Sequence, residues 1–289
     1  STLSLDSWLP LLNSGTSAAA SPAAPSASTF DLKLGTLDAF GKRLHAVTLR
    51  AGAEGRGWQA NIASTEMTGD LTYRGEERGK LTARLSHFTP PADAPATKQG
   101  GSGDLPAVDL IAERFDYRNK RLGRVEIVAQ PEGANWRIEK IANVNPEAAL
   151  TARGLWATGA NSRTSIDFAL NINDVGKYLD RVGTPDSVKG GTANLTGALT
   201  WAGEPLNIDF PSLSGQVGLQ AENGQFLEIE PGIGKLVSLM CLQMLPRRIA
   251  LDFRDVFSKG FAFDQISRNL NSERRALHTK NFKLSGSAP

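Results

Sequence analysis

The chain has 289 residues, of which 40% are hydrophobic, 7% aromatic and 21% charged. This apolar content is enough for a folded core, so wholesale disorder is excluded, and the length suits one elongated domain or two smaller ones. The 32 basic and 30 acidic residues give a formal charge of only +2. Because a general nucleic-acid binder is normally far more basic, no nucleic-acid partner is expected.

The N-terminal end predicts a short apolar helix followed by a linker. Residues 5–12 are mostly apolar, although Pro10 limits how far a regular helix can run through them. Residues 14–28 consist almost entirely of Ser, Ala, Pro, Gly and Thr, which is a linker composition. A second such tract covers residues 90–103. We therefore assign residues 1–28 to a helix and linker outside the main body.

Short segments of period-two alternation dominate the rest of the chain. Examples are Phe30–Leu34, Leu81–Leu85 and Ile166–Leu170, in which apolar and polar residues take turns. Such alternation is typical of strands with one buried and one wet face. Turns are expected at residues 54–57, 132–135 and 222–224, which are rich in Gly and Asn. The pattern predicts antiparallel hairpins.

An internal repeat of 78 residues organises these strands. This offset takes Trp58 to Trp136, and it takes residues 42–44, Lys-Arg-Leu, to the same tripeptide at 120–122. With one inserted residue, 71–75 falls on 150–154, and a weaker third copy begins near residue 194. Tandem units of this kind stack along one direction and build an elongated sheet, and a tryptophan that recurs in each unit is more often a core residue than a ligand site.

Two helices are expected to interrupt the strands. Residues 174–182 have apolar positions at helical spacing, and Asn173 or Asp174 can cap them. A second helix is expected over about 231–245, where Lys235 is the single charged residue. A helix that is apolar on every side must be buried in protein or lipid, but about 15 residues span only about 22 Å, short of a bilayer core.

The residue types needed for catalysis or metal binding do not form a recognisable pattern. Cys241 is alone and lies in the apolar segment, and His45, His87 and His278 are far apart in sequence. The glycine-flanked residues 75–80 lack the spacing and the hydroxyl residue of a phosphate loop. We expect no catalytic residue, no metal site, no cofactor and no enzymatic activity.

The charge is concentrated at the C-terminal end. Residues 246–289 carry nine basic and four acidic residues, so the remainder of the chain is slightly acidic. A basic end beside an apolar helix suits an anionic lipid surface, while a solvated strand face is the ordinary alternative. No run of residues is apolar enough to cross a bilayer and no signal peptide is visible, and because the chain opens on Ser1 we expect it to be part of a longer protein.

The C-terminal third carries a family resemblance. Residues 224–232 lead into the apolar segment, and the blocks 245–248, 251–257 and 260–264 follow it. These blocks, together with residues 5–9 and the tryptophan repeats, resemble the C-terminal region of the YhdP-type AsmA-like proteins of the TamB/AsmA superfamily of bridge-like lipid transporters. Met240-Cys241 departs from that pattern, where small or aliphatic residues are expected.

The resemblance implies an elongated, curled antiparallel sheet, a β-groove of the β-taco type, that passes phospholipids between the inner and outer membranes of a Gram-negative envelope. It implies a periplasmic location and an anchoring N-terminal helix outside this chain. Phospholipid acyl chains, the inner leaflet of the outer membrane and envelope proteins would be the partners. A scaffold or protein-interaction module with a closed β core is the alternative.

Domain limits and contact residues follow from this interpretation. We expect a tandem-repeat groove over residues 29–211 and a C-terminal β cap with the apolar helix over 212–289. The groove-lining candidates are Phe30, Leu32, Leu34, Leu81, Leu85, Ile166, Phe168 and Leu170. The candidates for lipid or membrane contact are Ile233, Leu236, Val237, Leu239, Met240, Leu242, Met244, Leu245, Arg247 and Arg248.

Overall fold

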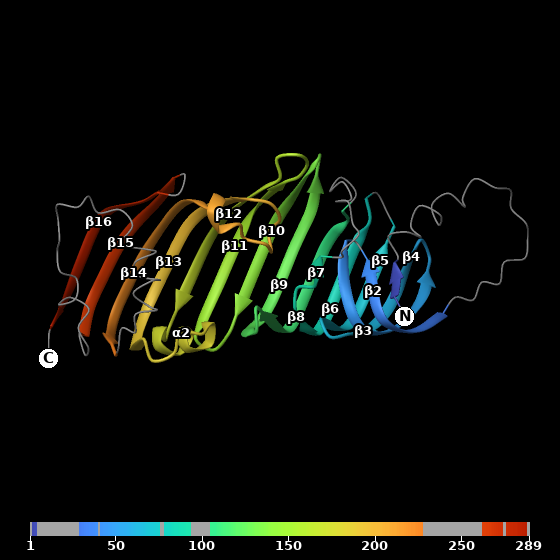
Figure 1. The fold of residues 1–289 in the computed structure, drawn as a ribbon, viewed down its shortest axis with the longest axis horizontal. Helices are drawn as coiled ribbons and strands as arrows, with labels where there is room; N and C mark the ends of the chain where they lie inside the picture. Colours follow the sequence, from blue (N-terminus) through green and yellow to red (C-terminus); the bar gives the residue numbers. More distant parts are fainter. Residues whose placement is uncertain are drawn as a thin grey trace, which may run out of the picture. The chain divides into compact units, whose positions relative to one another are not determined.

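The computed structural model describes residues 2–4, 29–39, 41–75, 78–93, 105–227, 262–273 and 276–287. Nearly all the regular structure in these ranges is β-strand (Figure 1). Long strands fit the sequence, because apolar-polar alternation sends one set of side chains to each face of a sheet. The mainly β, antiparallel fold with few helices that the sequence predicts is confirmed.

The strands hydrogen-bond in chain order, with the two-residue β7 pairing with β3 off this path. β1 pairs with β2 and β6 pairs with β8 in parallel, whereas the neighbouring strands from β2 to β6 and from β11 to β16 pair antiparallel. The strands are β1 (Thr2–Ser4), β2 (Thr29–Ala39), β3 (Lys42–Glu54), β4 (Gly57–Ala63), β5 (Met67–Arg74), β6 (Lys80–Phe88), β7 (Ala92–Asp93), β8 (Ala107–Tyr117), β9 (Lys120–Glu132), β10 (Asn135–Val144), β11 (Ala148–Ala157), β12 (Arg163–Ile172), β13 (Val188–Ala202), β14 (Ser214–Phe226), β15 (Ala262–Glu273) and β16 (Ala276–Ser287).

Contacts divide the chain into two compact units. Unit 1 comprises Ser1–Arg118 and Arg124–Arg137, and unit 2 comprises Asn119–Gly123 and Ile138–Pro289. Unit 1 contains a buried cluster of Leu37, Leu44, Val47 and Ile62, against which Leu3 of β1 packs. Unit 2 contains a buried cluster of Ala148, Ile172, Ala193 and Ala221. The domain limits expected at residues 28 and 211 stay a prediction.

The sequence repeat is a repeat of strands. β2 and β8 both have 11 residues, and β3 and β9 both have 13. The bounds of each second strand are those of the first plus 78, since 29 and 39 become 107 and 117, and 42 and 54 become 120 and 132. The turns expected at 54–57 and 132–135 join β3 to β4 and β9 to β10. Two copies of one hairpin therefore account for the shared tripeptide and the recurring tryptophan.

The helix expected at residues 174–182 is present as α2 (Val175–Val182), between β12 and β13. Asp174 caps its N-terminus, because the Asp174 side chain accepts a hydrogen bond from the backbone N–H of Lys177 at 3.0 Å. Gly183 ends the helix, and its N–H donates to the carbonyl oxygens of Leu179 and Asp180. A three-residue 3₁₀ helix, η3 (Phe210–Ser212), precedes β14.

One predicted turn is wrong. Residues 222–224 lie inside β14, where the pairing with β13 steps from Thr192–Glu222 to Gly190–Gly224. Asn223 has a positive φ of 55°, which asparagine tolerates better than most residues. The Asn-Gly signal therefore marks an irregularity within a strand and not the end of one.

Several expected segments lie outside the described residues. These are the helix at 5–12, the linker at 14–28, residues 94–103 of the second tract, and the apolar helix at 231–245. The first residues of the second tract are described, and Ala92 and Asp93 form β7, opposite Arg43 and Lys42 of β3. That part of the predicted linker is therefore a short strand pairing.

Candidate functional site

The strands of unit 2 present one apolar and one polar face. Cross-strand pairing aligns their side chains in rows, because directly opposed residues point to the same face of a sheet. From β11 to β14 the apolar rows are Ala148–Ile172–Ala193–Ala221, Leu150–Leu170–Leu195–Leu219, Ala152–Phe168–Gly197–Val217 and Gly154–Ile166–Leu199–Gly215. The opposite face has rows such as Arg153–Asp167–Ala198–Gln216. We call the first set the unit 2 apolar face.

Exposure along the unit 2 apolar face is greatest in its middle. The first row is buried, with Ile172 8% and Ala193 4% exposed. The three rows that follow, from Leu150 to Gly215, are only partly buried at every position. Beyond them Thr164 is 0% and Trp201 is 3% exposed. Three rows of partly exposed aliphatic and aromatic side chains thus lie between two buried ends, whereas a filled sandwich would bury such side chains.

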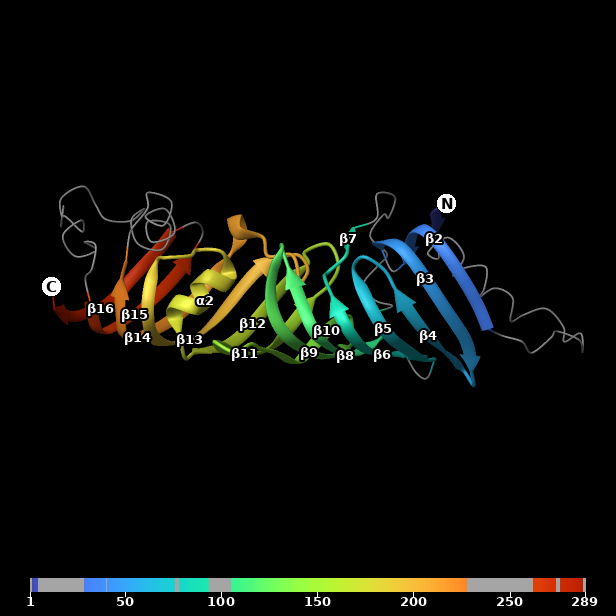
Figure 2. The same cartoon turned by 90° about the horizontal axis from the view of Figure 1, so that it is seen from below.

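Helix α2 covers one end of this face (Figure 2). Val175 and Tyr178 pack against the buried cluster of unit 2, and burial raises the pKa of the Tyr178 hydroxyl. Arg181 secures the helix, since its Nε donates to Glu147 Oε2 at 2.6 Å. This hydrogen bond holds the pKa of Glu147 below its ordinary value.

Tryptophans close the other end. Trp156 and Trp201 lie opposite Thr164 in the register, and all three are buried. Trp156 Nε1 donates to Ser162 Oγ at 2.8 Å, and Trp201 Nε1 donates to the carbonyl oxygen of Glu204 at 3.0 Å. Both indole N–H groups are therefore satisfied, and the rings act as apolar walls.

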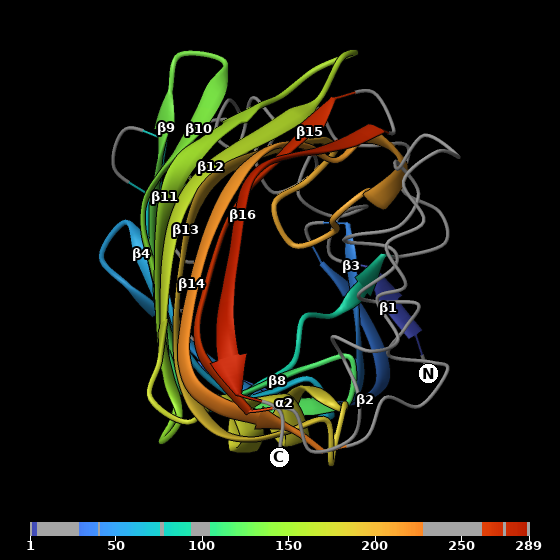
Figure 3. The same cartoon turned by 90° about the vertical axis from the view of Figure 1, so that its left-hand side faces the viewer.

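Glycine allows the strands of unit 2 to approach closely and bow, as Figure 3 shows for β11 to β14. A Cβ at Gly215 would lie 2.0 Å from the carbonyl oxygen of Ala198, and Gly215 has a φ of 143°. A Cβ at Gly154 would lie 2.0 Å from the carbonyl oxygen of Ser165. Both glycines belong to a row of the unit 2 apolar face. A larger side chain at either position would push the neighbouring strands apart.

Unit 1 carries an apolar face built in the same way. Its rows from β3 to β8 are Leu49–Ile62–Gly69–Leu85–Ala112, Ala51–Ala60–Leu71–Ala83–Leu110 and Ala53–Trp58–Tyr73–Leu81–Val108. β2 extends the first two rows with Leu32 and Phe30. Phe30 is 62% exposed, whereas Leu85 is 3% exposed. We call this set the unit 1 apolar face.

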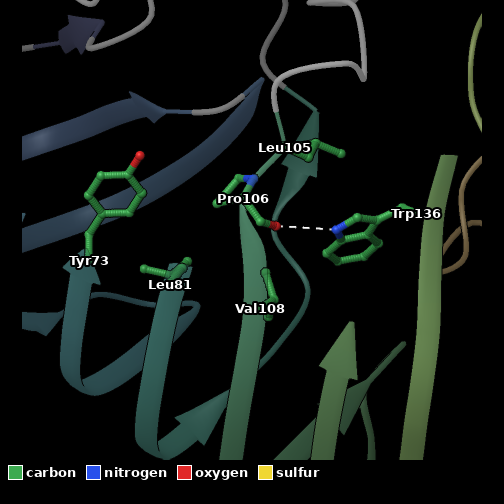
Figure 4. A pocket seen from close by; sticks show the side chains of 6 residues that line it. All are labelled: Tyr73, Leu81, Leu105, Pro106, Val108 and Trp136. Carbon is green, nitrogen blue, oxygen red and sulfur yellow. Dashed lines mark hydrogen bonds between the residues drawn. The ribbon is translucent and has the colours of Figure 1, made fainter. Parts of the chain in front are cut away.

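A small hollow opens on the unit 1 apolar face (Figure 4). It has a volume of about 150 Å³ and is lined by Tyr73, Leu81, Leu105, Pro106, Val108 and Trp136. Trp136 Nε1 donates to the carbonyl oxygen of Pro106 at 3.2 Å. The exposed lining of the hollow is apolar throughout.

All eight predicted groove-lining residues lie in the described strands. Phe30, Leu32 and Leu34 are on β2, Leu81 and Leu85 on β6, and Ile166, Phe168 and Leu170 on β12. The cross-strand pairings place all eight residues on the two apolar faces. Leu34 lies opposite Val47 of β3 and extends the unit 1 apolar face. Their contact with lipid stays a prediction. The ten membrane-contact candidates between Ile233 and Arg248 lie outside the described residues.

Sequence reasoning missed the apolar residues of β11, β13 and β14. Leu150, Leu195, Leu199, Val217 and Leu219 lie in the same rows as Phe168 and Leu170. The signal was present, because residues 195–199 and 215–219 also alternate with period two. Glycine and alanine at some inward positions interrupted the apolar pattern.

The described residues hold no group of three or more His, Cys, Asp or Glu side chains that could bind a metal ion. Within the same residues, no helix is long and apolar enough to cross a membrane. Cys241 and the basic segment 246–261 are outside them.

Comparison with known proteins identifies the family. The chain is 24% identical over 200 residues to the intermembrane phospholipid transporter YhdP of Escherichia coli (strain K12), an alignment that covers 68% of this chain and 16% of that protein. The chain thus spans a small part of the length of that relative. No solved structure gives a significant match. A profile of the YhdP protein family matches residues 1–289, so the chain belongs to the YhdP family.

Proposed function

We propose that this chain is part of a non-enzymatic conduit that passes phospholipids between the inner and outer membranes of a Gram-negative envelope. In this proposal the acyl chains lie against the two apolar faces and the headgroups stay in water. The location is the periplasm, and an N-terminal helix of the full-length protein anchors it in the inner membrane. The described transport activity of the Escherichia coli relative supports the proposal.

The observation that carries the proposal is the partial exposure of three consecutive rows on the unit 2 apolar face. Leu170, Phe168 and Ile166 occupy neighbouring rows, and each is only partly buried. Water contact with such side chains is unfavourable, and each methylene group buried against them gains about 0.8 kcal/mol. Contacts of this kind have no preferred register along a hydrocarbon chain, so a lipid can be held and still slide.

A photoreactive side chain tests this proposal. Benzoylphenylalanine at Phe168, on the apolar face, should crosslink to phospholipid in membrane-containing cells. The same residue at Ser165, which is exposed on the opposite face of β12, should not. Equal labelling at both positions, or none at Phe168 in a folded protein, would contradict a lipid path along this face.

A scaffold with a closed β core is the alternative. It requires the middle rows of the apolar face to be covered by protein, whereas Phe168 and Leu199 are partly exposed. Crosslinking of the Phe168 variant to an envelope protein, with phospholipid absent from the adduct, would favour the scaffold.

The C-terminal segment has a separate proposed role. We place the apolar residues from Ile233 to Leu245 in the inner leaflet of the outer membrane, with Arg247 and Arg248 close to anionic headgroups. This assignment rests on the sequence pattern.

A further inference from the structure

The hollow on the unit 1 apolar face has apolar walls. Leu81 and Val108 lie opposite one another in the parallel pairing of β6 and β8, and Tyr73 lies opposite Leu81. Trp136 borders the hollow from β10, and Leu105 and Pro106 border it from the chain just before β8 (Figure 4). An acyl chain in this hollow would be surrounded on several sides.

The polar groups of the lining are turned away or engaged. The indole N–H of Trp136 donates to the Pro106 carbonyl oxygen at 3.2 Å. A Cβ at Gly79 would lie 2.3 Å from the Tyr73 hydroxyl oxygen, so that hydroxyl lies against the backbone of Gly79. With no polar atom exposed in the lining, the hollow has nothing to offer a phosphate or a glycerol ester.

Its size fits a short piece of hydrocarbon. Apolar cavities of about 150 Å³ in proteins stay dry and take up benzene or xenon. The hollow of about 150 Å³ therefore has room for the last few carbons of an acyl chain and not for a whole lipid.

The two copies of the repeat differ beside the hollow. In the first copy Trp58 stacks on Tyr73, with ring centroids 5.8 Å apart and planes at 20°. In the second copy the residue that the sequence repeat aligns with Tyr73 is Ala152, which has no ring. The ring of Trp136 forms one wall of the hollow instead.

We propose that the hollow formed by Tyr73, Leu81, Leu105, Pro106, Val108 and Trp136 binds the methyl end of a phospholipid acyl chain. The site rests on the proposed lipid-conduit function and adds a resting position to it. A lipid whose acyl tail enters the hollow stops sliding along the apolar face. The hollow is therefore a preferred binding position within the conduit.

Fluorine NMR with spin-labelled lipid tests the site. The five tryptophans of the chain are replaced by fluorotryptophan, and Trp136→Phe assigns the Trp136 resonance. Phosphatidylethanolamine with a nitroxide near the methyl end should broaden that resonance strongly, and a nitroxide near the glycerol should broaden it much less. Val108→Phe, which fills the hollow, should abolish the difference. Thr82→Phe adds the same ring on the opposite face of β6 and should preserve it.

The outcomes separate the site from the conduit. If Phe168 crosslinks to lipid but the methyl-end label leaves Trp136 unchanged, the hollow is not a binding site and the conduit stands. If xenon shifts the Trp136 resonance while both lipids leave it unchanged, the hollow exists without an acyl ligand and the proposal is wrong. If neither Phe168 nor Trp136 senses lipid in a folded protein, the conduit itself fails.

Should the Trp136→Phe variant fail to fold, the Trp136 resonance is assigned by elimination, with the other four tryptophans replaced by Phe in turn at positions 8, 58, 156 and 201, and the methyl-end comparison is unchanged. Equal broadening by both nitroxide positions would mean that the whole lipid lies nearby without seating its tail, which would also overturn the proposal.

Discussion

Glu66 and Glu147 occupy the same place in two similar turns, directly before β5 and β11, but bind different partners. Each precedes β5 or β11 by one residue, and its backbone N–H donates to a capping side chain two residues earlier, Ser64 at 3.2 Å or Asn145 at 3.1 Å. Glu66 accepts a hydrogen bond from the backbone N–H of His45 at 2.8 Å. Glu147 accepts one from Arg181 of α2 at 2.6 Å.

The two turns use this carboxylate differently. In the first turn the carboxylate ties the connection between β4 and β5 to β3, since His45 lies on β3. In the second turn the carboxylate holds α2 through Arg181. A carboxylate in the same turn position therefore serves local structure in unit 1 and helix docking in unit 2.

Removing Arg181 should loosen α2 and reduce the pH dependence of stability. Arg181→Gln leaves Glu147, whose side chain is 12% exposed, without its charged partner, at a cost of about 1–3 kcal/mol. Because Arg181 lowers the pKa of Glu147 in the folded state, this stabilisation is present above the pKa of an unfolded Glu and is lost as pH falls. Urea unfolding between about pH 6 and pH 3 measures it, since an unperturbed Glu titrates near pH 4.3.

The variant should therefore lose less stability than the unmodified chain on acidification. Lys189→Gln is the control, because Lys189 is an exposed lysine on β13 of unit 2. An Arg181→Gln curve parallel to that of the unmodified chain would show that the pair does not couple to folding.

The hydrogen bond between His45 and Glu66 leads to a contrasting prediction. Glu66→Ala should cost about 1–3 kcal/mol, because it removes the acceptor of the His45 backbone N–H. His45→Ala should cost less than about 1 kcal/mol, because the imidazole is 51% exposed and the backbone N–H remains. Chemical denaturation of both variants checks the order. A larger loss of stability for His45→Ala would show that the imidazole, and not the hydrogen bond from the backbone N–H, contributes most of the stabilisation.

Close strand approach at the apolar face predicts intolerance to a single methyl group. Gly215→Ala should destabilise unit 2 by about 2–5 kcal/mol, because its φ of 143° disfavours L-residues and the new Cβ would meet the carbonyl oxygen of Ala198. Gly159→Ala has a φ of 100° but nothing within 4 Å of the Cβ, so it should cost only about 1–2 kcal/mol. Thermal unfolding of the two variants separates the effect of backbone strain from that of the steric clash. An equal loss of stability in both variants would show that the clash with the Ala198 carbonyl oxygen does not contribute.

Local patterns in the sequence predicted the strands well. Alternation in residues 166–170 and the 78-residue repeat were enough to predict β12 and the paired hairpins, because both signals depend on neighbours along the chain. The cap of α2 was also predicted, since Asp174 stands directly before the helical pattern.

The hollow and the closed ends of the apolar face were not predictable in the same way. They depend on which rows the strands share, and one residue of register shift would move every side chain to the other face. Trp201 and Trp156 meet through Thr164 although they are far apart in sequence. The turn predicted at Asn223 was wrong because asparagine tolerates a positive φ both in turns and at irregular positions within a strand.

The apolar C-terminal segment is expected to bind membranes. Replacing both Leu236 and Leu239 by Asp should abolish flotation of the chain with vesicles that contain anionic phospholipid, because carboxylates are costly in the bilayer. The β-strand circular dichroism signal should be unchanged. Loss of that signal would instead place the segment in the protein core.

A charge on the apolar face should block lipid binding without unfolding the sheet. Leu199 of β13 is partly exposed in the fourth apolar row, between Ile166 and Gly215. Leu199→Asp places a carboxylate where an acyl chain would lie, and burying an unpaired charge under lipid costs several kcal/mol. Phospholipid co-purified with the chain, measured by native mass spectrometry, should fall severalfold.

Ala198→Asp is the matched control for this change, because Ala198 is the neighbouring residue, is exposed and faces the other side of β13. It introduces the same charge into the same strand and should leave the lipid content unchanged. Both variants should keep the same β-strand circular dichroism signal, since neither position is fully buried. If both lose lipid equally, net charge and not the apolar face controls binding. If Leu199→Asp retains its lipid, the middle rows of unit 2 are not on the lipid path.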